Sequence, residues 1–174
     1  AAEQLDDALA DGSVSRDSRY PTLWQCFRAS YNQLGIDHNE SHQRLFRALC
    51  VVEKQESLPL SALAALWGID ETRAGRRARY MASVKLIEKR SESSGTREST
   101  FGLHDLLIDW IRDDLVEPVN REGFHAALVN NYASTLSLAL VDREPCRRWW
   151  KVPAGGYMER TLCRHLGAAG SPLR

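Results

Sequence analysis

One histidine, His104, lies where a strand-like pattern of residues gives way to a helical one, in the stretch TFGLHDLLIDWIRDDL (100–115). The first turn of a helix presents free backbone N–H groups and a partial positive charge, so anions bind there. A histidine in that turn can donate a ring N–H to a phosphate. It can equally be an exposed side chain beside a capping aspartate, and on local physics alone this second interpretation is the commoner outcome.

Signatures of catalysis are missing from the sequence. It has no Gly-x-x-x-x-Gly-Lys-Ser/Thr loop, no Gly-x-Gly-x-x-Gly and no local signature of a Ser-His-Asp or Cys-His site. Adjacent side chains on a helix diverge, so His104 and Asp105 are not an acid–base pair, and Asp105 is expected to be a cap or a structural anchor. We therefore assign no catalytic residue and expect this chain by itself not to be an enzyme.

A second candidate group is basic. Arg73, Arg76 and Arg77 share the outward side of a predicted helix, and Lys89, Arg90 and Arg97 lie in the hairpin that follows. They could contact DNA phosphates, and arginine can read guanine. The helix offers no Asn or Gln for adenine, and the formal net charge of the chain is zero. A solvated or protein-facing basic face is therefore favoured over a nucleic-acid partner.

Cysteines and tryptophans supply the remaining candidates. Cys26 and Cys50 lie in apolar helical patterns, which predicts buried, reduced thiols. Cys146, Cys163 and His165 fit no zinc spacing, so no metal site is predicted. The pair at 149–150, flanked by basic residues, could stack on a ligand or a lipid headgroup, although a loop anchored into the core is the more common arrangement.

Helical periodicity predicts the elements that must position these residues. Helices are expected over 3–10, from about residue 23 to Gly35, from Ser41 to Val52, and over 57–69, 71–84, 121–140 and 157–169. Asp70 is expected to cap the helix 71–84, and Pro118 to end the helix that carries His104. Strands 84–90 and 97–103 flank a Ser/Gly turn, and polar loops are expected over 12–21 and 142–156.

The order of these elements indicates the fold class. Three helices, a β-hairpin and a further helix across 41–115 are typical of a winged helix, with the hairpin as the wing. The whole chain is thus predicted to be mainly α, a winged helix followed by an α-helical region.

Composition is that of a globular chain, with 174 residues of which 43% are hydrophobic and 26% charged. No apolar run is long enough for a transmembrane helix, and the N-terminus has no signal-peptide pattern, so no membrane partner and a cytoplasmic location are expected. The chain does not begin with Met, which suggests a piece of a longer protein.

Five motifs occur along the chain in a fixed order: YNQLG (31–35), RLFRALCVV (44–52), LPLSALAALWGID (58–70), KLIEKR (85–90) and GLHDLL (102–107). Together they resemble the winged-helix domain of NB-ARC proteins, within the STAND class of signalling ATPases, and most of all its apoptotic-protease-activating-factor branch. Leu103-His104-Asp105 is similar to the Met-His-Asp motif of that family, with an apolar-for-apolar change that packing tolerates.

The resemblance implies a division of the chain and a role for His104. Residues 1–35 would be the end of the small helical domain, 36–117 the winged-helix domain and 118–174 the start of the second helical domain. His104 would contact the β-phosphate of ADP and hold the closed state, with Leu103 and Asp105 as its structural partners. The P-loop, the acidic Mg²⁺ site and the Gly-x-Pro segment would lie before residue 1, so that ADP or ATP is held mostly there and this chain alone binds nucleotide poorly.

The function implied is that of a regulatory module in apoptosis- or immunity-like signalling. ADP would keep the switch closed, and ATP would open it and drive oligomerisation. Its partners would be the nucleotide-binding domain of the same protein and, on activation, further copies of that protein. Two alternatives stay open at this point: a winged-helix DNA-binding transcriptional regulator, and a helical protein-interaction adaptor that uses residues 121–174.

Overall fold

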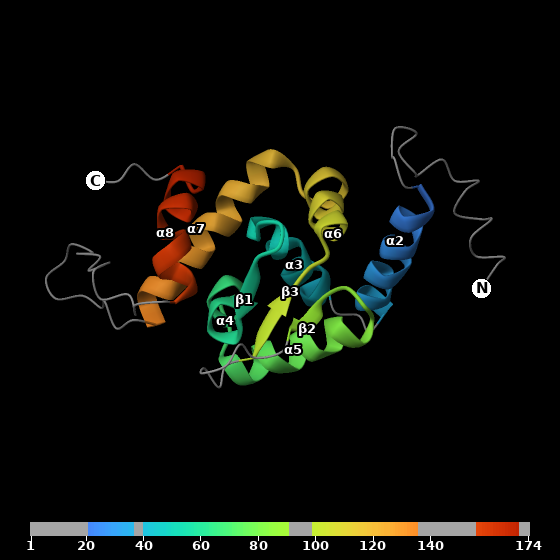
Figure 1. Ribbon diagram of the computed structural model, residues 1–174, viewed down its shortest axis with the longest axis horizontal. Coiled ribbons are helices and arrows are strands. Elements are labelled where there is room, and N and C mark those ends of the chain that lie inside the picture. The colour runs from blue at the N-terminus through green and yellow to red at the C-terminus, as the bar shows by residue number, and fades with distance from the viewer. Residues whose placement is uncertain (1–20, 37–39, 91–98, 136–155, 171–174) are drawn as a thin grey trace, which may run out of the picture.

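Helices dominate the described part of the chain, with one small antiparallel sheet among them (Figure 1). The computed structural model describes residues 21–36, 40–90, 99–135 and 156–170. The helix predicted over 3–10, most of both predicted loops, Arg97, Cys146 and the tryptophans at 149–150 lie outside these residues. In chain order the elements are α2 (Pro21–Ile36), α3 (Glu40–Ala48), the 3-10 turn η1 (Leu49–Val51), β1 (Ser57–Pro59), α4 (Leu60–Trp67), α5 (Glu71–Ser83), β2 (Glu88–Arg90), β3 (Thr100–Gly102), α6 (Asp105–Trp110), the π-helical turn η2 (Ile111–Leu115), α7 (Pro118–Thr135) and α8 (Tyr157–Ala168).

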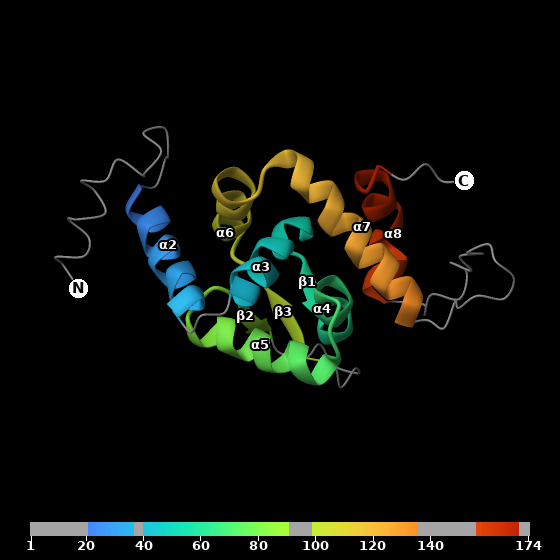
Figure 2. The same cartoon turned by 180° about the vertical axis from the view of Figure 1, so that it is seen from behind.

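The sheet and the helices α3 to α5 lie at the centre of the molecule. Both views place α2 at one end and the pair α7 and α8 at the other, with α5 and α6 on opposite sides of the sheet (Figures 1 and 2). Helix α7 packs against α4 and against α8. The His104 segment joins β3 to α6, so the sheet and α6 together fix its position.

The predicted helix 57–69 is wrong in its first three residues, which form β1. Pro59 follows Leu58, and the residue before a proline is driven toward extended backbone. Ser57, Leu58 and Pro59 pair with Gly102, Phe101 and Thr100 of β3. Because β2 pairs with the other edge of β3, the strand order is β1-β3-β2.

The predicted hairpin is confirmed, but its strands are shorter than expected. Lys85 adopts a left-handed backbone with φ of 64°, and the Leu86 N–H donates to the carbonyl of Met81 at 3.0 Å. This turn ends α5 and drives Leu86 and Ile87 into the core, where both are buried. Strand pairing therefore begins only at Glu88, since the residues before it are used to close the helix.

One continuous hydrophobic core joins all the helices described. Trp110 lies at its centre with no exposed surface, and its ring meets those of Phe27, Tyr31 and Phe46 at centroid distances of 5.9, 5.8 and 6.4 Å. The same cluster extends through Leu128 of α7 to buried residues of α8. Burial of each such side chain stabilises the fold by roughly 1.5–3 kcal/mol. The predicted boundary between 117 and 118 stays a prediction.

The predicted cap of α5 is confirmed, and the buried side of this helix follows the helical period. Asp70 is its N-cap and accepts a hydrogen bond from the Arg73 N–H at 2.9 Å. Ala74, Ala78 and Met81 form its buried side, as the helical period requires.

The prediction for the two cysteines was half right. Cys50 is a buried free thiol, and burial raises its pKa to about 11. Cys26 is a free thiol but exposed, which corrects the expectation. On α2, Phe27 and Tyr31 turn toward Trp110, and Cys26 lies about 100° around the helix from Phe27, beside the apolar stripe instead of within it.

Candidate functional site

His104, and not Asp105, is the N-cap of α6, and the His104 side chain is exposed. Its Nδ1 accepts a hydrogen bond from the Leu106 N–H at 3.2 Å, and its carbonyl accepts from the Leu107 N–H at 2.8 Å. An imidazole that accepts at Nδ1 carries its proton at Nε2 when neutral. The cap therefore orients the ring so that one N–H remains on the Nε2 side to donate to an external acceptor.

Asp105 fastens α6 to the loop before β1. Its Oδ1 accepts a hydrogen bond from the Gln55 N–H at 3.0 Å. Gln55 has a φ of 62°, in the left-handed region that is costly for a residue other than glycine. The carboxylate thus stabilises a strained turn, and it points toward the protein backbone while His104 points outward.

Leu103 is buried, and its backbone is held by Arg90. The Arg90 guanidinium donates to the carbonyls of Leu103 and Gln55 at 3.5 and 3.3 Å and to the Ser57 Oγ at 3.1 Å. A Cβ added at Gly102 would collide with this guanidinium. Arg90, which the sequence suggested as a wing cation for DNA, is thus inserted into the junction that positions His104.

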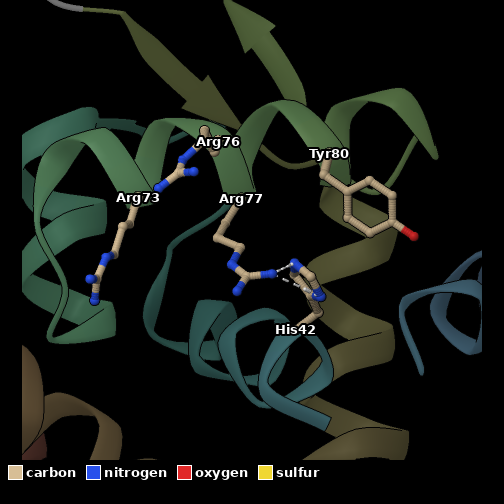
Figure 3. A pocket seen from close by; sticks show the side chains of 5 residues that line it. All are labelled: His42, Arg73, Arg76, Arg77 and Tyr80. Carbon is tan, nitrogen blue, oxygen red and sulfur yellow. Dashed lines mark hydrogen bonds between the residues drawn. The ribbon is translucent and has the colours of Figure 1, made fainter. Parts of the chain in front are cut away.

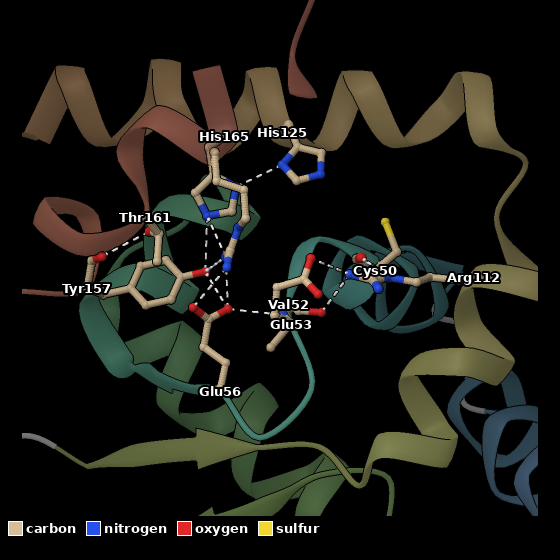
Figure 4. Close-up of polar contacts among 10 residues, drawn as sticks. Cys50, Val52, Glu53, Glu56, Arg112, His125, Tyr157, Thr161 and His165 are labelled. Carbon is tan, nitrogen blue, oxygen red and sulfur yellow. Dashed lines mark hydrogen bonds and ion pairs between the residues drawn. The ribbon is translucent and has the colours of Figure 1, made fainter. Parts of the chain in front are cut away.

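The 53–56 loop contacts both η2 and the C-terminal helix α8 (Figure 4). Glu53 pairs with Arg112 of η2 at 3.0 Å, and Arg112 also donates to the carbonyls of Cys50 and Val52. Glu56 accepts two hydrogen bonds from Arg164 of α8, at 3.2 and 2.9 Å. The loop that holds Asp105 is therefore also held by η2 and α8.

A chain of polar side chains continues from Glu56 into the core between α7 and α8 (Figure 4). The Tyr157 hydroxyl donates to Glu56 at 3.3 Å and lies 3.1 Å from the His165 Nε2. The His165 Nδ1 lies 2.8 Å from the His125 Nδ1, so one ring donates and the other accepts. We call His125, Tyr157, Arg164 and His165, together with Glu56, the histidine cluster.

Burial sets the titration of the histidine cluster. It lowers the pKa of His165 to about 3 and that of His125 to about 4, with the positive charge of Arg164 acting in the same direction. Burial and the neighbouring Glu56 carboxylate raise the pKa of Tyr157. Both imidazoles are accordingly neutral near pH 7. From the sequence, His165 was considered only as a zinc ligand, a role that its spacing from the cysteines does not fit. Its partners on other elements were not predicted.

The three predicted arginines lie together on α5, with Arg73 and Arg76 exposed and Arg77 half-buried. They border a pocket of about 440 Å³, the arginine pocket, whose lining is completed by His42 and Tyr80. Figure 3 shows Arg73 and Arg77 extending from the same side of α5, with Arg77 reaching His42 on α3. The contribution of His42, which lies on another helix, was not predicted from the sequence.

Two further findings concern only the residues that the structure describes. Within them, no three His, Cys, Asp or Glu side chains gather in a way that could hold a metal ion. None of the described helices combines the length and the apolar character needed to cross a membrane.

Neither the models of known protein families nor the curated proteins give a match to this chain.

Proposed function

We propose that this chain is the regulatory winged-helix module of an NB-ARC-type nucleotide switch. The winged helix would comprise α3, β1, α4, α5 and the β2–β3 hairpin as the wing, with α6 packed behind it. The strand order β1-β3-β2 supports this proposal, because it combines three helices with a hairpin whose second strand is central. The partner of the module would be the nucleotide-binding domain of the same protein.

The observation that carries the proposal is the geometry of His104. Its Nδ1 is occupied by the Leu106 N–H, and its exposed ring retains an N–H at Nε2 in the neutral state. A phosphate oxygen of ADP, held mostly by the nucleotide-binding domain, would accept from that N–H. Leu103 and Asp105 would serve the contact indirectly, since burial and the bond to Gln55 fix the backbone on both sides of the histidine.

Such a contact acts as a switch only if it exists in one state. A ligand shifts a conformational equilibrium by the difference in its interaction free energy with the two states. A charge-assisted hydrogen bond of roughly 1.5–3 kcal/mol corresponds to a change of about ten- to over a hundredfold in the ratio of closed to open molecules. Opening with ATP in place of ADP would then release the module and allow copies of the protein to assemble.

The test uses the full-length protein that contains this chain. We expect His104→Ala to speed ADP release by about tenfold or more and to raise spontaneous activation, because the closed state loses its phosphate contact. His104→Asn is the matched variant, since asparagine is a good N-cap that keeps α6 intact but has no imidazole. If both variants retain ADP like the unmodified protein, the proposal is wrong; if only the alanine variant releases it, the effect comes from the lost cap.

A second candidate is a winged-helix DNA-binding regulator, and the exposure of Arg73 and Arg76 on α5 favours it. Phosphate contacts by arginine would make its binding strongly dependent on salt. A fluorescence assay with duplex DNA at low salt tests it, since Arg76→Glu should abolish sequence-preferring binding. Absence of binding by the unmodified chain would exclude this candidate.

A further inference from the structure

The arginine pocket concentrates positive charge that its own lining does not balance. Three guanidinium groups border it, and no carboxylate is among its lining residues in the described part of the chain. Asp70 pairs with Arg73 at 3.2 Å, but both side chains are more than half exposed, so solvent weakens this pair. Arg76 makes no hydrogen bond or ion pair with a described residue. Gathered like charges repel, and a bound anion would relieve that repulsion.

The three arginines stand on one stretch of α5 and border the same recess. Arg73, Arg76 and Arg77 stand at positions i, i+3 and i+4 of α5, where neighbouring Cβ atoms are about 5–6 Å apart. Arg77 is half-buried, and its Nη1 contacts the imidazole of His42, which is itself buried. A guanidinium can only donate, so the contacted ring nitrogen accepts, and this leaves the remaining N–H groups of Arg77 for the pocket.

We propose that the arginine pocket binds a small polyanion that carries adjacent phosphate groups, such as an oligophosphate. Guanidinium groups bind phosphate oxygens in bidentate fashion, and several of them on one helix side match several phosphates in a row. The site is distinct from His104, which does not line the pocket, and it does not depend on the proposed nucleotide switch.

The shape of the site favours a small ligand over a nucleic acid. The pocket is a recess between two helices, with His42 on α3 opposite the α5 arginines (Figure 3). Arg79, also on α5, is exposed but does not line the pocket. A duplex would be expected to engage such outer charges as well, and domains that bind it are usually basic, whereas this chain has a formal net charge of zero.

The proposal is tested by calorimetric titration of the purified chain with inorganic triphosphate at low ionic strength. We expect saturable binding that Arg76→Gln weakens by about tenfold or more, because a charge-assisted contact is lost. Arg79→Gln is the matched control, with the same charge change on the same helix but outside the pocket. It should alter the affinity by less than about threefold, since solvent screens exposed charges that do not touch the ligand.

Three results would overturn the proposal: no binding of triphosphate by the unmodified chain, equal weakening by Arg76→Gln and Arg79→Gln, or duplex DNA that binds more tightly than triphosphate and depends on both arginines. His104→Ala separates this site from the nucleotide switch and should leave the affinity for triphosphate unchanged. Any ADP that the isolated chain binds at this pocket should likewise be lost with Arg76→Gln and kept with His104→Ala.

Discussion

The two neutral imidazoles of the histidine cluster predict that the fold loses stability in mild acid. Burial holds the folded-state pKa of His165 at about 3 and that of His125 at about 4, against an ordinary value of 6.5. At pH values between the folded-state and the ordinary pKa, the unfolded chain binds protons at these histidines that the folded chain does not. The free energy of unfolding therefore rises with pH across this window, and this contribution is fully present only above about pH 6.5.

The size of this stability loss follows from the range of pH over which each histidine stays neutral in the fold but binds a proton in the unfolded chain. Each histidine that stays neutral in the fold costs about 1.4 kcal/mol of stability for each pH unit below its unfolded pKa. Acidification from about pH 6.5 to about pH 5 thus costs on the order of 2 kcal/mol for His165. His125 adds a similar amount, and the sum of about 4 kcal/mol is an upper bound because the two rings share one hydrogen bond. Domains are typically stable by only about 5–15 kcal/mol, so the effect is large.

Urea denaturation followed by circular dichroism at several pH values measures this loss. The double variant His125→Gln, His165→Gln should be less stable near neutrality and should show a much flatter dependence on pH, because the two titrating groups are gone. Cys163→Ser, an exposed position on α8, is the matched control and should keep the full slope. Equal slopes in the unmodified chain and the double variant would refute the reasoning.

Two further predictions concern the junction around His104 and the link to α8. Glu56→Ala leaves the partly buried Arg164 without its carboxylate partner. This variant should lower the free energy of unfolding by about 2–3 kcal/mol, as measured by denaturant unfolding. A loss below about 0.5 kcal/mol would show that solvent replaces the ion pair. Gly102→Ala should destabilise by about 1–3 kcal/mol, because the new methyl group displaces the Arg90 guanidinium. In a double-mutant cycle with Arg90→Ala, additive losses would contradict this cause.

Local patterns were enough to predict most helices and the position of His104. The Asp70 cap is formed by groups three residues apart, and the buried side of α5 follows from the helical period alone. The N-cap contact of His104 joins its ring to a backbone N–H two residues later. Interactions of such short range are encoded in a few consecutive residues, so a single sequence reveals where they form.

Long-range pairing decided the rest. The residues of β1 were predicted to begin a helix. They form a strand because their backbone pairs with that of β3, more than forty residues later in the chain. From the sequence, Arg90 was interpreted as a wing cation. In the structure its guanidinium is inserted beside Gly102, and this close approach exists only in the folded sheet.

The sequence by itself thus determined most of the helices, the Asp70 cap, the hairpin and the place of His104 at the start of one helix. The tertiary structure alone decided the histidine cluster and the arginine pocket. Tyr157 and Arg164 lie 101 and 108 residues from Glu56 along the chain, and His42 lies 35 residues from Arg77. No local period links residues at such separations, and they meet because apolar burial around Trp110 and Leu128 brings their helices together.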